Sequence, residues 1–186
     1  NVTQNSPCFS QEFAPTSMAY AETQSMFCDS LLDDADWLKR YARNAKGEAI
    51  PDELIRARIE STQPFAAFAE RGILVVPVFE RALYRLSDEE LTPERVLLLA
   101  RECEQRILGV AVGPRPLLAI PHLLNQESAA SYHGYLLANM AVYQTRAYFE
   151  RTYGYLTDNP AIGPALSEHY WARGNSISHN DTLVSL

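Results

Sequence analysis

Residues 92–109 read TPERVLLLARECEQRILG and carry the clearest structural signal in the chain. Thr92 is a residue type that caps helix N-termini, and Pro93 suits the first helical position, where no N–H is needed. Glu94 follows in the first turn, and Gly109 is the residue type that most often ends a helix. The stretch therefore predicts a helix with both ends defined.

Helical patterns cover most of the remaining chain. Apolar periodicity and helix-breaking residues predict further helices over residues 16–43, 52–61, 64–86, 128–153 and 161–172. In the first of them, the spacing of one helix face connects Met18, Ala21, Ser25, Cys28 and Leu32. Neither a repeat nor an alternating strand pattern is present, so we expect a mostly α fold of compactly packed helices.

For one segment, the sequence pattern is compatible with either a strand or a helix. Residues 73–76 (ILVV) would suit a buried strand, but Pro77 follows directly. Proline lacks the N–H that a sheet needs and is poorly tolerated inside a strand, so a helix kinked or broken at Pro77 is favoured.

Composition limits the classes of partner and compartment. The 186 residues suit about one domain, and 16 Lys and Arg against 23 Asp and Glu give a net charge of −7. Without a basic stripe, neither nucleic acid nor an anionic membrane is expected as a partner. Cys8, Cys28 and Cys103 are an odd number and form no C-x-x-C pair, which argues against a disulfide framework and favours a reducing, cytoplasmic location.

The common catalytic motifs are not found in the sequence. The four histidines include no pair at i and i+4 that would place two imidazoles on one helix face around a metal. Glu-x-x-His, G-x-S-x-G, Walker and G-x-G-x-x-G patterns are also missing. The chain by itself therefore contains no complete catalytic set.

Four segments, in this order, resemble a known enzyme family. They are residues 19–27 (AYAETQSMF), residues 47–55 (GEAIPDELI), His122 with residues 132–136 (YHGYL), and, more weakly, residues 170–176 (YWARGNS). Together they are similar to the C-terminal portion of the thimet oligopeptidase and oligopeptidase A family of zinc metallopeptidases. The resemblance covers most of the chain.

The resemblance implies a zinc site shared with residues outside this chain. In the family, a His-Glu-x-x-His helix supplies two ligands of one Zn²⁺ and the general base, and a later glutamate supplies the third ligand. Glu22 matches that glutamate. We therefore expect residues 1–186 to be a single helical piece of a catalytic domain, truncated at both ends, that begins just after the His-Glu-x-x-His helix.

A physical argument for Glu22 as a metal ligand is independent of the resemblance. On a helix its neighbours include Met18, Ser25 and Met26, and a carboxylate among methionines is costly to bury without a partner. A cation such as Zn²⁺ would offset that cost. The alternative, a half-exposed glutamate on an amphipathic helix, stays open.

His122, Tyr132 and Tyr135 form a second set of candidates. The two tyrosines are three residues apart, so both can project from one face of a helix. The resemblance implies that Tyr135 stabilises the transition state, that Tyr132 and His122 bind substrate, and that Arg173 contacts it. Ordinary aromatic packing for the tyrosines, and a surface ion pair for Arg173, are the alternatives.

The loop before the tyrosines departs from the family. The family has a Gly-Gly-Tyr segment there, whereas residues 125–128 read NQES. A loop without glycine has fewer backbone states available, so its closure and the preferred peptide length stay open.

The resemblance as a whole implies a zinc metalloendopeptidase that hydrolyses short peptides. Its partners would be those peptides and the upstream remainder of the catalytic domain, and residues 1–186 alone would be inactive. Two rivals remain. One is a non-catalytic peptide-binding domain without a metal site. The other is a plain helical interaction domain, in which Tyr132 and Tyr135 would be buried in a core with no channel beside them.

Overall fold

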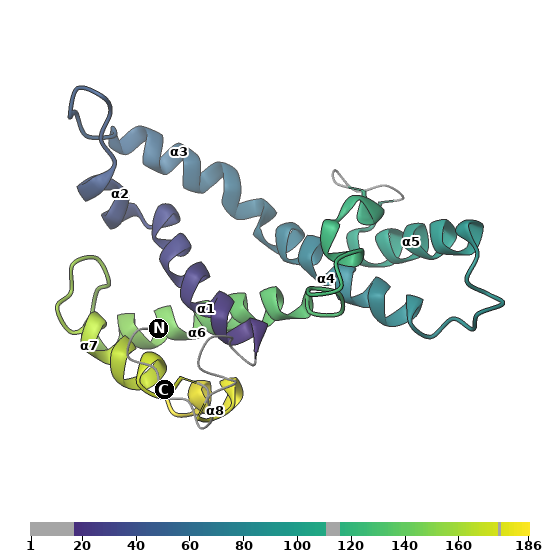
Figure 1. Cartoon of the computed structure of the whole chain (residues 1–186). Coiled ribbons are helices and arrows are strands. Elements are labelled where there is room, and N and C mark those ends of the chain that lie inside the picture. The colour runs from purple at the N-terminus through teal and green to yellow at the C-terminus, as the bar shows by residue number, and fades with distance from the viewer. Residues whose placement is uncertain (1–16, 111–115, 175) are drawn as a thin grey trace. The chain divides into compact units, whose positions relative to one another are not determined.

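The computed structural model describes residues 17–110, 116–174 and 176–186. The fold is mostly α, as predicted: about 70% is helical, and the described residues contain no β-strand (Figure 1). One isolated antiparallel bridge, between Arg43 and Ala49, closes the loop before the third α-helix.

The contacts divide the chain into two units. The first unit contains the described residues up to Ile59 together with Leu137–Leu186, and the second is Glu60–Leu136. The prediction that residues 1–186 form one piece of a catalytic domain stays a prediction.

The first unit is built around two long segments, one from each half of the chain. Its helices are α1 (Met18–Asp29), η2 (Ser30–Asp33), α2 (Ala35–Tyr41), most of α3 (Asp52–Thr62), most of α6 (His133–Tyr153), α7 (Ile162–Leu166), the π-helical η6 (Ser167–Trp171) and α8 (His179–Val184). Its core gathers Phe27, Val142, Phe149, Leu156, Ile162 and Ala165.

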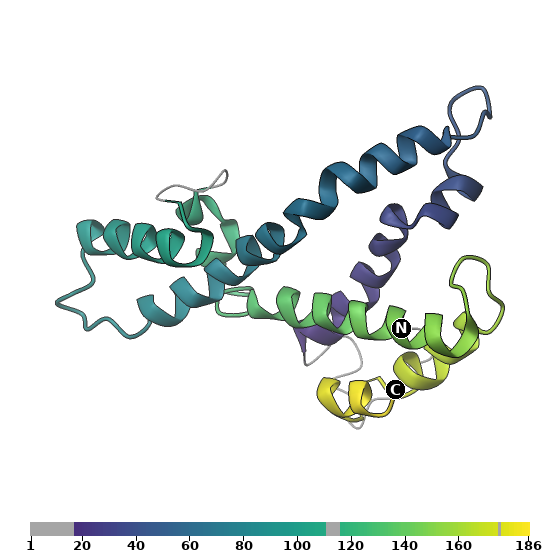
Figure 2. The same ribbon diagram turned by 180° about the vertical axis from the view of Figure 1, so that it is seen from behind.

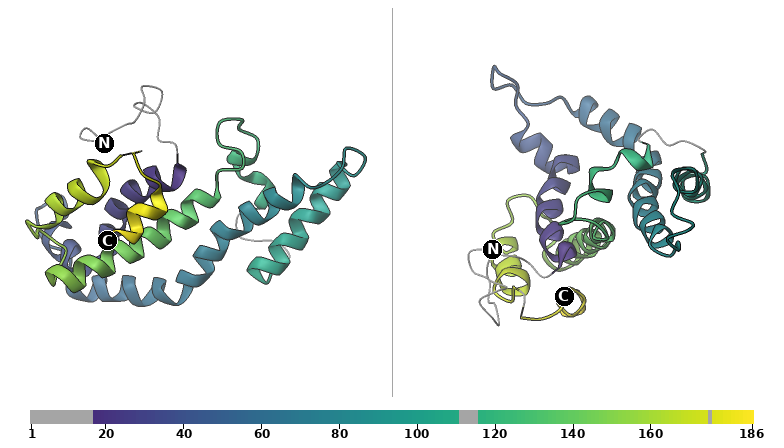
Figure 3. Two further views of the ribbon diagram at one scale, coloured as in Figure 1. Left: turned by 90° about the horizontal axis from the view of Figure 1, so that it is seen from below. Right: turned by 45° about the vertical axis from the view of Figure 1, so that its right-hand side comes forward.

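The second unit is organised by two helices that pack along each other. They are α4 (Ala66–Leu83) and α5 (Pro93–Leu108), seen side by side in Figures 1 and 2 and again in both views of Figure 3. Short turns η3 (Gln63–Phe65), η4 (Leu117–Ala119) and η5 (Pro121–Leu123) complete the unit. Its core includes Val76, Phe79, Leu99, Cys103 and Leu117.

The predicted ends of α5 are confirmed. The Thr92 Oγ1 accepts a hydrogen bond from the Arg95 N–H at 3.3 Å, which satisfies one of the unpaired donors at the helix start. Gly109 ends the helix with φ 79°, a left-handed conformation that costs glycine nothing.

The segment around Pro77 is helical, as favoured over a strand. Pro77 lies inside α4, which continues on both sides of it from Ala66 to Leu83. The missing N–H removes one intrahelical hydrogen bond, but burial of Val75, Val76 and Phe79 against α5 keeps the segment helical.

Two predicted helices differ from the structure. The helix predicted over residues 16–43 is divided into α1, η2 and α2, because Asp34 is extended and its side chain caps the start of α2. In α1 the buried residues are Ala19, Tyr20, Thr23 and Phe27, so the face predicted from Met18, Ala21, Ser25, Cys28 and Leu32 is wrong. Two aromatic rings seven residues apart bury more area than that small-residue face would. The predicted helix over residues 128–153 begins only at His133. The reason is Ala130, whose φ of 59° interrupts a right-handed helix.

The structure describes two of the three cysteines and allows a search for membrane-spanning helices. Cys103 is buried and Cys28 is exposed, both as free thiols, and Cys8 lies outside the described residues. Among the helices that the structure describes, none combines the length and apolar character that crossing a membrane requires.

Candidate functional site

Three of the predicted site residues meet in the second unit. The rings of His122, Tyr132 and Tyr135 all contact one another: centroids are 5.0 Å apart for His122 and Tyr132, 5.8 Å for His122 and Tyr135, and 5.0 Å for the two tyrosines. All three contacts are edge-to-face, the arrangement that aromatic quadrupoles favour. We call these three residues the His–Tyr cluster.

The cluster is assembled by a turn, a loop and a helix start. His122 lies in η5, Tyr132 precedes α6, and Tyr135 is in the first turn of α6. The intervening loop is held by the buried carboxyl group of Glu80, whose Oε1 accepts a hydrogen bond from the Ala130 N–H at 2.7 Å. This bond connects α4 to the loop directly before the tyrosines.

The polar atoms of the cluster can act on a carbonyl group. The Tyr135 hydroxyl and the His122 Nε2 are 3.3 Å apart, and the tautomer of the imidazole decides which of them donates. The His122 Nδ1 is buried and has no hydrogen-bond partner among the described residues. A phenol and an imidazole at this separation are donors of the kind that bind a carbonyl oxygen and stabilise charge developing on it.

Burial distinguishes the cluster from a plain core. Tyr132 and Tyr135 are both half-buried, and Tyr132 also lines a pocket of about 300 Å³. Both tyrosines are thus less buried than the interaction-domain rival predicts, although Tyr132 packs against the core of the second unit.

The other two predicted residues lie in the first unit. Glu22 is half-buried on α1, and its Oε2 accepts a hydrogen bond from the Ser25 hydroxyl at 2.9 Å. Glu22 therefore matches the alternative of a half-exposed glutamate on a helix, so the cost of burying an unpaired carboxylate, on which the physical argument for a metal relied, does not arise. Arg173 follows η6 and donates through Nη1 to the Ser185 hydroxyl at 2.9 Å. Among the described residues, Arg173 thus contacts a serine hydroxyl rather than the carboxylate that a surface ion pair would need.

A zinc site is not completed within the described residues. No three His, Cys, Asp or Glu side chains among residues 17–110, 116–174 and 176–186 are grouped so that they could hold a metal ion. The resemblance assigns the other ligands to residues outside this chain. The half-buried, hydrogen-bonded Glu22 carboxylate fits the part of third ligand, for which one oxygen is sufficient.

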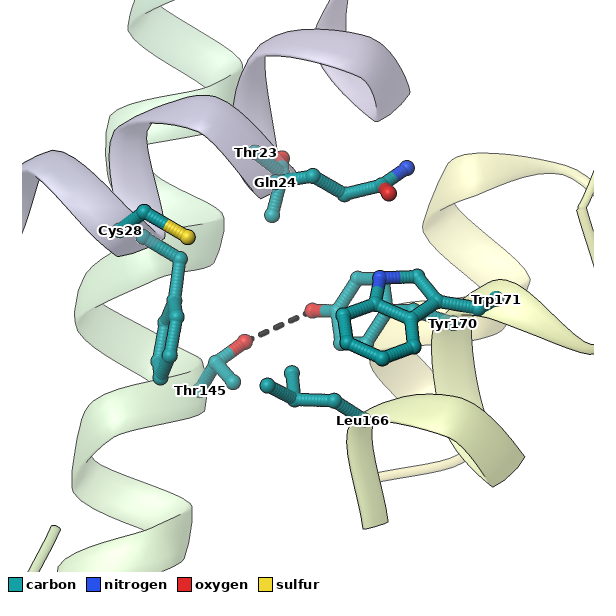
Figure 4. A pocket seen from close by; sticks show the side chains of 8 residues that line it. Thr23, Gln24, Cys28, Thr145, Leu166, Tyr170 and Trp171 are labelled. Carbon is teal, nitrogen blue, oxygen red and sulfur yellow. Dashed lines mark hydrogen bonds between the residues drawn. The ribbon is translucent and has the colours of Figure 1, made fainter. Parts of the chain in front are cut away.

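A small cavity lies between α1 and the helices α6, α7 and η6 of the first unit. Thr23, Gln24, Phe27 and Cys28 line a cavity of about 30 Å³ together with Thr145, Leu166, Tyr170 and Trp171 (Figure 4). The Tyr170 and Thr145 hydroxyls share a hydrogen bond of 2.7 Å, and the Tyr20 hydroxyl donates to the Tyr170 carbonyl at 3.0 Å. Burial raises the pKa of the Tyr170 phenol. A space of this size is too small for a ligand, so we assign these contacts to the positioning of α1.

His179 is a polar site that sequence reasoning did not single out. Its Nε2 lies 3.3 Å from the Thr23 hydroxyl, its ring packs edge-on against Tyr20, and burial lowers its pKa. It lines a pocket of about 320 Å³ with residues that include Ser17 and Asn180. Nothing in the spacing of the histidines marks this one, because its partners are about 150 residues away in the chain.

Comparison with known proteins adds no relatives. The chain matches no protein-family model, no curated protein and no solved structure.

Proposed function

We propose that this chain is the C-terminal part of a cytoplasmic zinc-dependent oligopeptidase that hydrolyses short peptides. The observation that carries the proposal is the His–Tyr cluster. The family resemblance implies related roles for His122, Tyr132 and Tyr135. At least ten residues separate the histidine from the tyrosines in the sequence, yet the three rings contact one another.

The roles follow from the chemistry of each group. Zinc, when bound, supplies an activated water for attack on the peptide carbonyl. Glu22 would contribute the third protein ligand, oriented by Ser25. Tyr135 would donate its hydroxyl proton in a hydrogen bond to the oxygen on which negative charge develops, while His122 and Tyr132 hold the same carbonyl in place. Arg173 would contact the peptide further along.

Removal of one hydroxyl tests the catalytic role. In the full-length protein, Tyr135→Phe keeps the ring that packs on His122 but loses the donor, so we expect kcat to fall by about 100- to 1000-fold on a quenched fluorescent peptide. Tyr143→Phe is the matched control, because Tyr143 is on the same helix and 60% exposed. Full activity of Tyr135→Phe would contradict the assignment.

The metal role has its own test. Glu22→Gln should lower the zinc content of the purified full-length protein, measured by atomic absorption, whereas Asp29→Asn, an exposed change on the same helix, should not. Chelator-sensitive peptidase activity is expected from the full-length protein and none from residues 1–186 alone. Activity of the isolated 186 residues would contradict the proposal that the zinc site is shared with residues outside this chain.

A peptide-binding domain without metal is the second candidate. The apolar pocket beside Tyr132 favours it, because apolar binding needs no metal. It predicts that peptide binding persists in a full-length protein that contains no zinc and that Glu22→Gln changes nothing.

A further inference from the structure

Two buried glutamates of the second unit bind backbone N–H groups. Glu104 on α5 is 4% exposed, and its Oε1 accepts a hydrogen bond from the Leu117 N–H at 2.9 Å. Glu80 on α4 is 3% exposed, and its Oε1 accepts from the Ala130 N–H at 2.7 Å. Neither carboxylate belongs to the His–Tyr cluster.

The two bonds lie at opposite ends of the segment that contains His122. Residues 117–130, which we call the anchored segment, begin at the donor for Glu104 and end at the donor for Glu80. His122 lies between these ends, in η5. Because α4 and α5 pack along each other, both ends are attached to one pair of helices. The position of the imidazole therefore depends on both carboxylates.

Apolar contacts alone do not define the orientation of the anchored segment. Leu117 and Ile120 are buried in the core of the second unit, and Leu123 packs against it, whereas residues 124–127 are exposed. Apolar burial keeps these side chains in the core, but it is non-directional. Hydrogen bonds to carboxylates are directional and strong, so they can define the direction in which His122 projects.

The two carboxylates are costly to the stability of the second unit. Burying a carboxylate costs more than burying an apolar side chain of similar size, and a bond from a neutral N–H offsets only part of that cost. The Oε2 of Glu80 is buried and has no hydrogen-bond partner among the described residues. Stability therefore does not account for the two glutamates, and the contacts indicate a defined placement of the anchored segment as their effect.

We propose that Glu104 and Glu80 are positioning residues that act through His122, by fixing the two ends of the anchored segment so that the imidazole lies beside the Tyr135 hydroxyl before a substrate binds. The separation that they maintain is the 3.3 Å between the His122 Nε2 and that hydroxyl. Donors that are already in place need no reordering during the reaction. The inference rests on the proposed function for the reaction, whereas the placement of His122 is independent of it.

Removal of one anchor should affect kcat more than KM. In the full-length protein, Glu104→Leu has a similar size but provides no acceptor. We expect kcat to fall about 10- to 100-fold on a quenched fluorescent peptide, because a misplacement of about 1 Å can cost this much. KM should change little, since the contact with the carbonyl oxygen strengthens in the transition state. Glu104→Gln keeps an oxygen that can accept the bond and should restore most of the activity.

Glu102→Gln is the matched control. Glu102 is exposed on the same helix and pairs with Arg95, so this change should leave kcat and KM as they are. A circular dichroism melt checks that Glu104→Leu is folded. If it is not, Glu80→Leu removes the other anchor and should lower kcat in the same way.

A double-mutant cycle distinguishes positioning from general support of the fold. If Glu104 acts through His122, Glu104→Leu should lower kcat no further in a protein that already carries His122→Gln. Additive losses would overturn the proposal, because Glu104 would then affect activity by another route. Unchanged kcat in folded Glu104→Leu and Glu80→Leu would overturn it as well.

A measurement without turnover separates this inference from the proposed function. In the full-length protein with isotope-labelled histidine, the NMR signals of the His122 ring, assigned with His122→Gln, should shift or broaden in Glu104→Leu and recover in Glu104→Gln. This result in a protein without chelator-sensitive hydrolysis would support the anchors while refuting the peptidase. Hydrolysis that depends on Tyr135 but is unaffected by Glu104→Leu would support the peptidase while refuting the anchors.

Discussion

The hydrogen bond from Ala130 to Glu80 should control the stability of the loop that carries the tyrosines. The Glu80 carboxyl group is only 3% exposed, its Oε1 accepts from the Ala130 N–H at 2.7 Å, and its Oε2 is buried without a partner among the described residues. Ala130 has φ 59°, a conformation that costs a residue with a Cβ atom about 1–2 kcal/mol. The bond to Glu80 is therefore what offsets the strain.

The magnitude follows from what each substitution removes. A hydrogen bond to a carboxylate is worth about 1.5–3 kcal/mol, and one to a neutral amide about 0.5–1.5 kcal/mol. Glu80→Ala should therefore destabilise the loop by about 2 kcal/mol, and Glu80→Gln, which keeps an acceptor, by about 1 kcal/mol.

Hydrogen exchange of the full-length protein is the direct measurement. Because exchange reports local opening, Glu80→Ala should reduce protection in residues 125–135 by about 30-fold, as 1.4 kcal/mol is a factor of ten. Ala130→Gly keeps the bond and removes the strain, at an entropic cost of about 0.5–1 kcal/mol, so its protection should stay the same or rise. Unchanged protection in Glu80→Ala, or higher protection in Glu80→Leu, would refute the reasoning.

Two further predictions concern the first unit. Burial lowers the pKa of His179 below its ordinary 6.5, so the stability it contributes should be complete above pH 6.5 and be lost as the pH falls through the lowered pKa. Melting temperatures from pH 8 to pH 5 check this, and His179→Gln should flatten the profile. Arg146→Met should cost about 2 kcal/mol in urea unfolding, because it removes the charged partner of the largely buried Asp34 and leaves that carboxylate only its neutral donors. Arg58→Met, which breaks an exposed pair with Asp33, should cost less than about 1 kcal/mol.

Helix α5 illustrates what is readable from local sequence. Thr92 and Gly109 act on backbone groups within a few residues of themselves, so their effect does not depend on the rest of the chain. Helix α8, by contrast, was not predicted from the sequence. It has six residues, capped by Ser178, and is too short to show an apolar period.

Helices α1 and α6 show where local reading is insufficient. The buried face of α1 depends on which partner accepts Tyr20 and Phe27, and the start of α6 depends on a carboxyl group 50 residues earlier in the chain. Neither partner is indicated by spacing within the helix itself.

The sequence by itself determined the mostly α class, the capped ends of α5 and the residue types of the candidate site, because propensities, caps and motifs are local properties. Only the tertiary structure decided that His122 meets Tyr132 and Tyr135, and that Ala69 and Gly72 leave a pocket beside them. Ring contacts and cavities arise where distant segments pack, and packing depends on the shapes of all partners at once.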